Sequence, residues 1–185
     1  MRKIYWQFQA IYDLKKNKGR PMPKKIIATN ENIKKLVEDA IKEHGLNCDL
    51  SYIDVSNVTD MSFLFQYSQF NGNINNWDVS HVTEMKAMFQ YSDFNGDISK
   101  WNVSKVTDMR GMFFLCDFDG DISGWNVSNV TDMRGMFLYS PFSGDISNWK
   151  VSPKVNITMM FKDSALEALG KIPAWAKESG TEDQP

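Results

Sequence analysis

The chain has 185 residues, a net charge of −2 and hydrophobic residues at 42% of its positions, enough for one packed domain or a short array of repeats. Proteins that neutralise many phosphates are usually basic, so we expect no nucleic-acid partner. No apolar run is long enough to span a membrane, and the N-terminus lacks the apolar stretch of a signal peptide. The sequence by itself therefore favours a cytoplasmic protein.

Residues 1–28 form an N-terminal extension. Aromatic residues such as Trp6 and Phe8 make residues 1–14 too apolar for a free tail, whereas residues 15–23 are typical of a linker. We expect residues 1–14 to pack either on the rest of the chain or on a partner, and the sequence pattern fits both.

Residues 29–56 are predicted to cap the N-terminal end with a helix at residues 31–44 and a first coil. Apolar residues recur there at helical spacing, and Gly45 ends the pattern. Val37 lies 24 residues before Met61, so the helix is a degenerate copy of the repeat that follows it.

Residues 57–165 repeat with a period of 24 residues. Columns of Ile, Val, Met and Phe keep this step, and the tryptophans mark it most clearly. The tryptophans are Trp77, Trp101, Trp125 and Trp149. One unit of this length cannot bury its apolar face alone, so we expect the units to stack and their columns to form one continuous core.

The first half of each unit has the pattern of a short strand. In residues 98–106, the residues Ile98, Trp101, Val103 and Val106 match the L-x-x-L-x-L frame of leucine-rich repeats. Apolar and polar residues alternate with the period of two that a strand requires, so Trp101 and Val103 are expected to face inward.

The second half of each unit has helical spacing. Met109, Met112, Phe113 and Cys116 would share one face of a two-turn helix, and Thr107 is its candidate N-cap. The two halves together predict an α/β fold. We expect a leucine-rich-repeat-like right-handed solenoid, with a parallel β-sheet on one face and short helices on the other.

The repeat decays after Trp149. Residues 166–176 leave the period but keep apolar residues such as Ile172 and Trp175, which predicts a C-terminal cap. Residues 177–185 are polar and are predicted to be a disordered tail.

The amino-acid sequence of the repeat unit is specific, above all Asn-Val-Thr-Asp-Met at residues 57–61 and Phe-Asn-Gly-Asp-Ile-Ser at residues 94–99. It resembles the BspA-type leucine-rich-repeat surface proteins, and most closely the subgroup of mycoplasma lipoproteins, over residues 46–165. This resemblance implies a bacterial protein that serves in surface adhesion or host-protein binding. The chain departs from the family because it has no evident signal peptide, lipobox or anchor, so the surface location is not carried over.

Two surfaces are candidates for partner binding. The first is the polar face of the predicted sheet, formed by Asn76, Asp78, Lys100, Asn102, Asn126, Asn148 and Lys150. The alternative is that the Asn and Ser residues recur because identical strands stack well. Lys100 and its equivalents vary more from copy to copy, which makes them better contact candidates.

The second candidate surface is a column on the predicted helices, formed by Tyr67, Tyr91, Leu115 and Tyr139. Phe114 and Leu138 stand beside it, where other repeats carry glutamine. Exposed aromatic residues at regular spacing are typical of an interface. The alternative is packing between neighbouring helices.

No motif predicts catalysis or a cofactor, and neither His44 nor His81 can be paired with a nucleophile. One acidic column suggests calcium, namely Asp49, Asn73, Asp97, Asp121 and Asp145. Calcium needs several converging oxygens, so we expect these residues to cap their own loops and predict no metal site. Cys116 is expected to be a buried, inert thiol.

These observations favour a monomeric, non-catalytic protein–protein interaction module that serves adhesion or the binding of a host or partner protein. Two alternatives remain from the sequence. One is a structural or assembly component, and the other is a small intracellular inhibitor protein from a mobile element.

Overall fold

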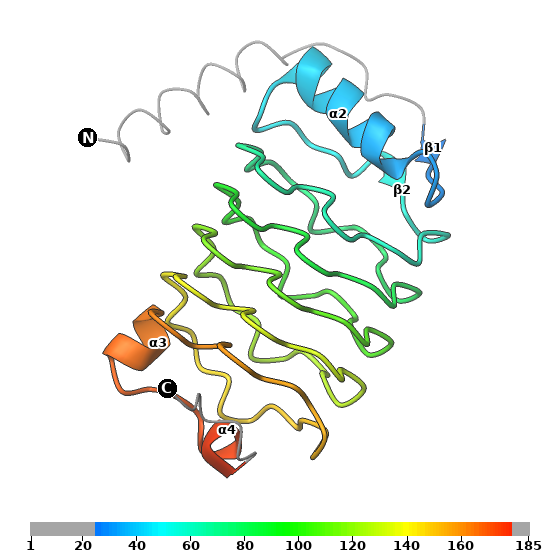
Figure 1. Ribbon diagram of the computed structural model, residues 1–185. Helices are drawn as coiled ribbons and strands as arrows, with labels where there is room; N and C mark the ends of the chain where they lie inside the picture. Colours follow the sequence, from blue (N-terminus) through cyan, green and yellow to red (C-terminus); the bar gives the residue numbers. More distant parts are fainter. Residues whose placement is uncertain (1–24, 179–185) are drawn as a thin grey trace, which may run out of the picture.

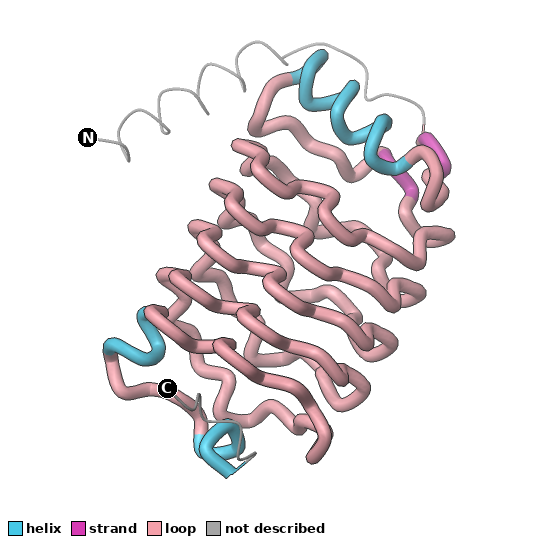
Figure 2. The backbone as a smooth tube through the Cα atoms, in the orientation of Figure 1, coloured by secondary structure: helices cyan, strands magenta, loops and turns pink. Residues whose placement is uncertain are grey.

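The computed structural model describes residues 25–178. Its elements are the strand β1 (Ile26–Ile27), the helix α2 (Ile33–His44), the strand β2 (Ile53–Asp54) and the helices α3 (Ala165–Ala168) and α4 (Ala174–Glu178). β1 and β2 pair in parallel, with Ile26 opposite Ile53. Between β2 and α3 the chain runs through irregular coils that lie one beside the next (Figures 1 and 2).

The predicted α/β leucine-rich-repeat-like right-handed solenoid, with a parallel sheet on one face and short helices on the other, is wrong. Each strand is two residues long, and within the described chain no helix lies between α2 and α3. Strand-like pairing in the coils is limited to isolated parallel bridges, such as the one between Asp108 and Asp132. The helices lie at the two ends of the coils (Figure 2).

The predicted helix at Met109–Cys116 does not form because its backbone bonds run between coils. The N–H groups of Met109, Gly111, Phe113 and Leu115 donate to carbonyls 23 residues later, at 2.8 to 3.0 Å. An α-helix would use the same N–H groups for carbonyls four residues earlier. We call this segment, residues 107–115 with its equivalents in the other coils, the ladder half. Thr107 is likewise no N-cap, because its hydroxyl donates to the carbonyl of Thr83 in the preceding coil at 3.2 Å.

Left-handed backbone conformations also interrupt the ladder half in every coil. Gly111 has φ +59° and Leu115 has φ +49°, and the equivalent residues of the other coils have φ between +52° and +62°. A single residue of this kind breaks a right-handed helix. The ladder half is therefore a series of tight turns whose alternate N–H groups point to the next coil.

The predicted strand is also absent, because the backbone of residues 98–106 bonds locally. The N–H of Trp101 donates to Ile98 at 3.1 Å, and the N–H of Val106 donates to Val103 at 3.0 Å. We call this segment and its equivalents the tryptophan half. Its coils are joined by side chains, since the indole of Trp101 donates to the carbonyl of Ile74 at 3.2 Å. Trp77, Trp125 and Trp149 make the same contact with the preceding coil.

The apolar columns form one core, as the spacing predicts. Met109, Met112 and Phe113 are fully buried, although they lie on no helix. The phenylalanine rings stack from coil to coil, with 5.8 Å between the centroids of Phe113 and Phe137. Burying one such side chain contributes about 1.5–3 kcal/mol, so the repeated columns supply most of the stabilisation of the stack.

Both ends of the apolar core are covered. α2 lies where the sequence predicts a capping helix, with Val37 and Ala40 buried in the core. At the other end, Trp175 stacks on Trp149 and donates to the carbonyl of Ile146 at 3.0 Å, so it takes the place of a further repeat tryptophan. Most of the predicted N-terminal extension, and the predicted tail beyond α4, lie outside the described residues.

Candidate functional site

The ladder half carries a row of exposed aromatic and aliphatic side chains along the stack. Tyr67 is 70% exposed, Tyr91 39%, Leu115 43% and Tyr139 50%. Phe114 and Leu138 stand beside them and are half-buried. We call these six residues the tyrosine face. It contains the column that the sequence singles out, but it lies on turns and not on helices.

The rings of the tyrosine face contact one another across the coils. The ring centroids of Tyr67 and Tyr91 are 4.9 Å apart, as are those of Tyr91 and Phe114, and Phe114 lies 6.2 Å from Tyr139. Packing between neighbouring copies therefore does occur, as the alternative interpretation requires, although between coils and not helices. It leaves the outer surfaces of the rings uncovered, because large fractions of Tyr67 and Tyr139 remain exposed.

Backbone geometry makes the tyrosine face unusual. Tyr67, Tyr91, Leu115 and Tyr139 all have φ between +49° and +58°. For a bulky residue this conformation costs about 1–2 kcal/mol, and glycine or asparagine would occupy it more easily. The other left-handed column of the ladder half does use Gly111 and Gly135. Sequence reasoning missed this strain, and those two glycines were the available signal.

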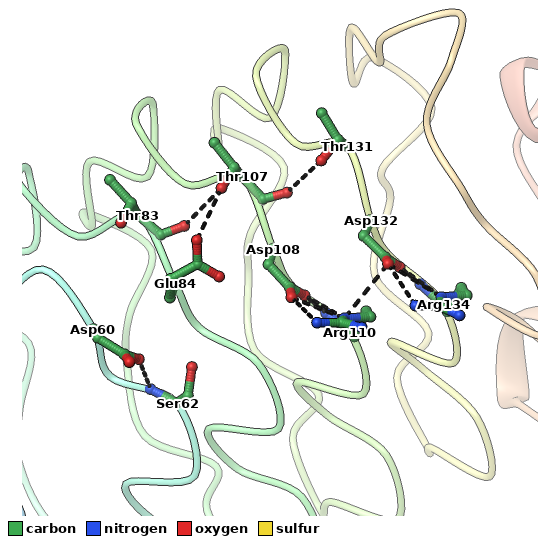
Figure 3. A network of polar contacts seen from close by, with 10 residues as sticks. All are labelled: Asp60, Ser62, Thr83, Glu84, Thr107, Asp108, Arg110, Thr131, Asp132 and Arg134. Carbon is green, nitrogen blue, oxygen red and sulfur yellow. Dashed lines mark hydrogen bonds and ion pairs between the residues drawn. The ribbon is translucent and has the colours of Figure 1, made fainter.

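A row of charged side chains lies on the ladder half (Figure 3). Arg110 pairs with Asp108 in its own coil and lies 3.4 Å from Asp132 of the next coil, which in turn pairs with Arg134 at 2.8 Å. Hydrogen bonds with Asp108 raise the pKa of the Arg110 guanidinium. Arg110 and Asp132 therefore link two successive coils by a charge contact.

The predicted polar strip lies on the tryptophan half, where no sheet supports it. Asn76, Asp78, Lys100, Asn102, Asn126, Asn148 and Lys150 are all exposed. The side-chain oxygens of Asp78, Asn102 and Asn126 accept the backbone N–H two residues later, at 3.1 to 3.2 Å. These three residues therefore recur because they form turns, which leaves Lys100 and Lys150 as the better contact candidates of the strip.

The acidic column suspected of binding calcium also consists of turn residues. Each side-chain oxygen of Asp49, Asn73, Asp97, Asp121 and Asp145 accepts the N–H two residues later, at 2.8 to 3.1 Å. The backbone hydrogen bond from Ser99 lowers the pKa of Asp97. In the part of the chain that the structure describes, no three potential metal ligands lie together.

Cys116 is a buried thiol in contact with Ser92, whose Oγ lies 3.4 Å from its Sγ. Burial raises the pKa of Cys116 to about 11. A thiol with this pKa is almost wholly protonated near neutral pH, so Cys116 is suited to packing and not to nucleophilic attack.

Comparison with known proteins identifies the family. The model of the family described as "Mycoplasma protein of unknown function, DUF285" matches residues 31–137 and, overlapping, residues 69–175. The chain belongs to this family. Taken together, the two matches span α2, the coils and the start of α4. Neither the curated proteins nor the solved structures contain a match to it. Across residues 25–178, no helix has the length and apolar content needed to cross a membrane.

Proposed function

We propose that this chain is a non-catalytic, monomeric protein-binding module and that the tyrosine face contacts its partner. The observation that carries the proposal is the row of exposed aromatic side chains in left-handed conformations. The fold needs a left-handed residue at Tyr67, Tyr91 and Tyr139 but does not need a large apolar side chain there.

Tyrosine is well suited to such a surface. It offers a large contact area and a hydroxyl group with little conformational entropy to lose, and it is enriched where interfaces concentrate their binding energy. The stacking of Tyr67 on Tyr91 also fixes the rings before a partner arrives. The resemblance of the repeat to BspA-type surface proteins supports the same class of function, adhesion or the binding of a host protein.

The test compares two pairs of substitutions in the full chain. Tyr91→Asn with Tyr139→Asn removes two rings and keeps residues that accept a positive φ, so the fold should be retained. Lys100→Glu with Lys150→Glu alters the polar strip instead. Each chain is used to capture proteins from a host lysate, and the captured protein is then purified and titrated.

We expect the asparagine pair to weaken binding by about 2 kcal/mol or more, and the lysine pair to leave it within about 0.5 kcal/mol. The reverse result would move the binding site to the polar strip. Light scattering on the wild-type chain provides a separate check, because a stable oligomer would indicate an assembly component.

A further inference from the structure

Most backbone hydrogen bonds of the ladder half point the same way along the stack. The exceptions lie at its start, where the N–H of Thr107 donates back to the carbonyl of Thr83 at 2.8 Å. The peptide group between Glu84 and Met85 shows the pattern. Its carbonyl accepts the N–H of Met61 at 2.9 Å, and its N–H donates to the carbonyl of Asp108 at 2.9 Å. The same pair of bonds recurs in the following coils. Peptide dipoles aligned head to tail in this way leave a positive end where the N–H groups emerge, as at the start of a helix.

That positive end is the last coil, residues 155–163, which has no ladder half after it. Within residues 25–178, the N–H groups of Ile157, Met159 and Phe161 have no hydrogen-bond partner. The next N–H in the series, that of Asp163, donates to the carboxylate of Glu167 at 2.7 Å. One position of the row is thus already occupied by a carboxylate from the chain itself.

The same end of the molecule is basic. Four exposed lysines lie immediately before the last coil, within it or in the segment that follows it, namely Lys154, Lys162, Lys171 and Lys177. The acidic residues of residues 154–177 are Asp163 and Glu167. In the preceding coils the balance is the opposite, because acidic residues outnumber basic ones.

This edge offers donors without acceptors. The carbonyls of Ile157, Met159 and Phe161 each accept the N–H three residues later, at 2.9, 3.4 and 3.0 Å, so they are already used. Two copies of the edge cannot pair with each other, since both would present N–H groups. Carbonyls that could accept these N–H groups from a second copy belong to the first coil, which lies beside α2 (Figure 1). Val37 and Ala40 of α2 are buried and would have to leave the core before another copy could stack there.

We propose that the N–H groups of Ile157, Met159 and Phe161 form a docking edge for an extended acidic segment of a partner protein. Carbonyls at alternate residues of the segment would accept the three N–H groups and continue the ladder by one strand. Its acidic side chains would lie against Lys154 and Lys162. This edge is separate from the tyrosine face and does not rest on the function proposed for that face.

The experiment uses the full chain labelled with ¹⁵N and two blocked octapeptides, one alternating Glu and Val and the other alternating Lys and Val. We expect the Glu peptide to shift the amide signals of Ile157, Met159 and Phe161 and to slow their hydrogen exchange at least tenfold. The Lys peptide should bind at least tenfold more weakly. Equal binding of the two peptides would overturn the proposal, and so would unchanged signals at the three amides.

Charge-reversal variants distinguish binding of the Glu peptide at this edge from nonspecific electrostatic attraction to the chain. Lys154→Glu with Lys162→Glu should weaken binding of the Glu peptide roughly tenfold. The matched pair Lys34→Glu with Lys105→Glu, both exposed and distant from the edge in sequence, should leave it within about twofold. If the three amides are already protected in the free chain and the Glu peptide does not bind, the edge is occupied by the chain itself or by a second copy, and the proposal is wrong.

Discussion

The two halves of each coil are held together by different forces. In the ladder half, backbone N–H groups bond from coil to coil, and left-handed residues recur at fixed positions. In the tryptophan half, backbone groups bond locally, and the coils are joined by buried side chains and by the indole N–H. The same 24-residue period therefore serves two kinds of stacking.

This difference explains where the sequence is constrained and where it is free. The tryptophan half needs one particular side chain, because only an indole both fills the core position and reaches the carbonyl of the preceding coil. The ladder half needs particular backbone angles, and it tolerates Phe, Ala, Gly and Met at one left-handed column. Outward-facing residues of the ladder half are thus free to vary, and the binding role proposed for the tyrosine face depends on this freedom.

The largest expected effect is in the tryptophan half. Trp101→Ala should lower the free energy of unfolding by about 3–5 kcal/mol, because it empties a buried site and removes the indole hydrogen bond to the carbonyl of Ile74. Urea denaturation would measure the change. Trp101→Phe is the control, since it keeps an aromatic ring and loses the hydrogen bond, at a cost of about 1–3 kcal/mol. A free energy of unfolding for Trp101→Ala close to that of the wild-type chain would contradict the stabilising role of the tryptophan column.

A smaller effect is expected from the backbone of the ladder half. Gly111→Ala should cost about 1–2 kcal/mol because φ is +59°, while the added Cβ would meet nothing closer than 3.9 Å. Gly124→Ala is the matched control in the tryptophan half, with open space and no left-handed φ. It should be neutral or stabilising by about 0.4–1 kcal/mol. Equal thermal shifts for both variants would show that backbone strain does not distinguish the halves.

Acid titration should separate charge from turn formation in the tryptophan half. Asp54 pairs with Lys25 at 2.8 Å, and its pKa is lowered to about 2, first by the hydrogen bond with Lys25 and then by Ser56. A lowered pKa gives stability that is present above the ordinary value near 4 and lost as the pH falls toward 2.

Asp54→Asn should therefore cost about 0.2–1 kcal/mol at pH 7 and almost nothing near pH 2. Asp78→Asn, at the equivalent position but without an ion pair, should cost less, since Asn102 and Asn126 form the same turn. Denaturant melts of both variants at the two pH values provide the measurement. A cost for Asp54→Asn that persists at low pH would contradict the ion pair.

The smallest expected effect is at the tyrosine face. Tyr67→Asn should change the free energy of unfolding by less than about 0.5 kcal/mol, because relief of the strained φ offsets the lost contact with Tyr91. Comparing the thermal melting of Tyr67→Asn with that of Trp101→Ala would sharpen the contrast between the two halves of the coil. A loss of several degrees would show that the ring serves stability and would weaken the proposed binding role.

Burial was predictable from the repeat, but secondary structure was not. Met109, Met112, Phe113 and Cys116 have the spacing of a helix face, and all four are buried. A tight turn with left-handed residues at Gly111 and Leu115 gives the same periodic burial, so hydrophobic spacing could not separate it from a helix. The tyrosine column could be found as a candidate site, whereas its strained backbone could not.

The sequence by itself determined the 24-residue period, the membership of the core columns and the position of the capping helix, because these depend on which residues are apolar and how far apart they lie. Only the tertiary structure decided which backbone groups bond between coils. It also decided why Gly96 is required, since a Cβ there would lie 2.8 Å from the ring of Phe94. Such choices depend on the neighbouring coil, which supplies acceptors and space that no single repeat encodes.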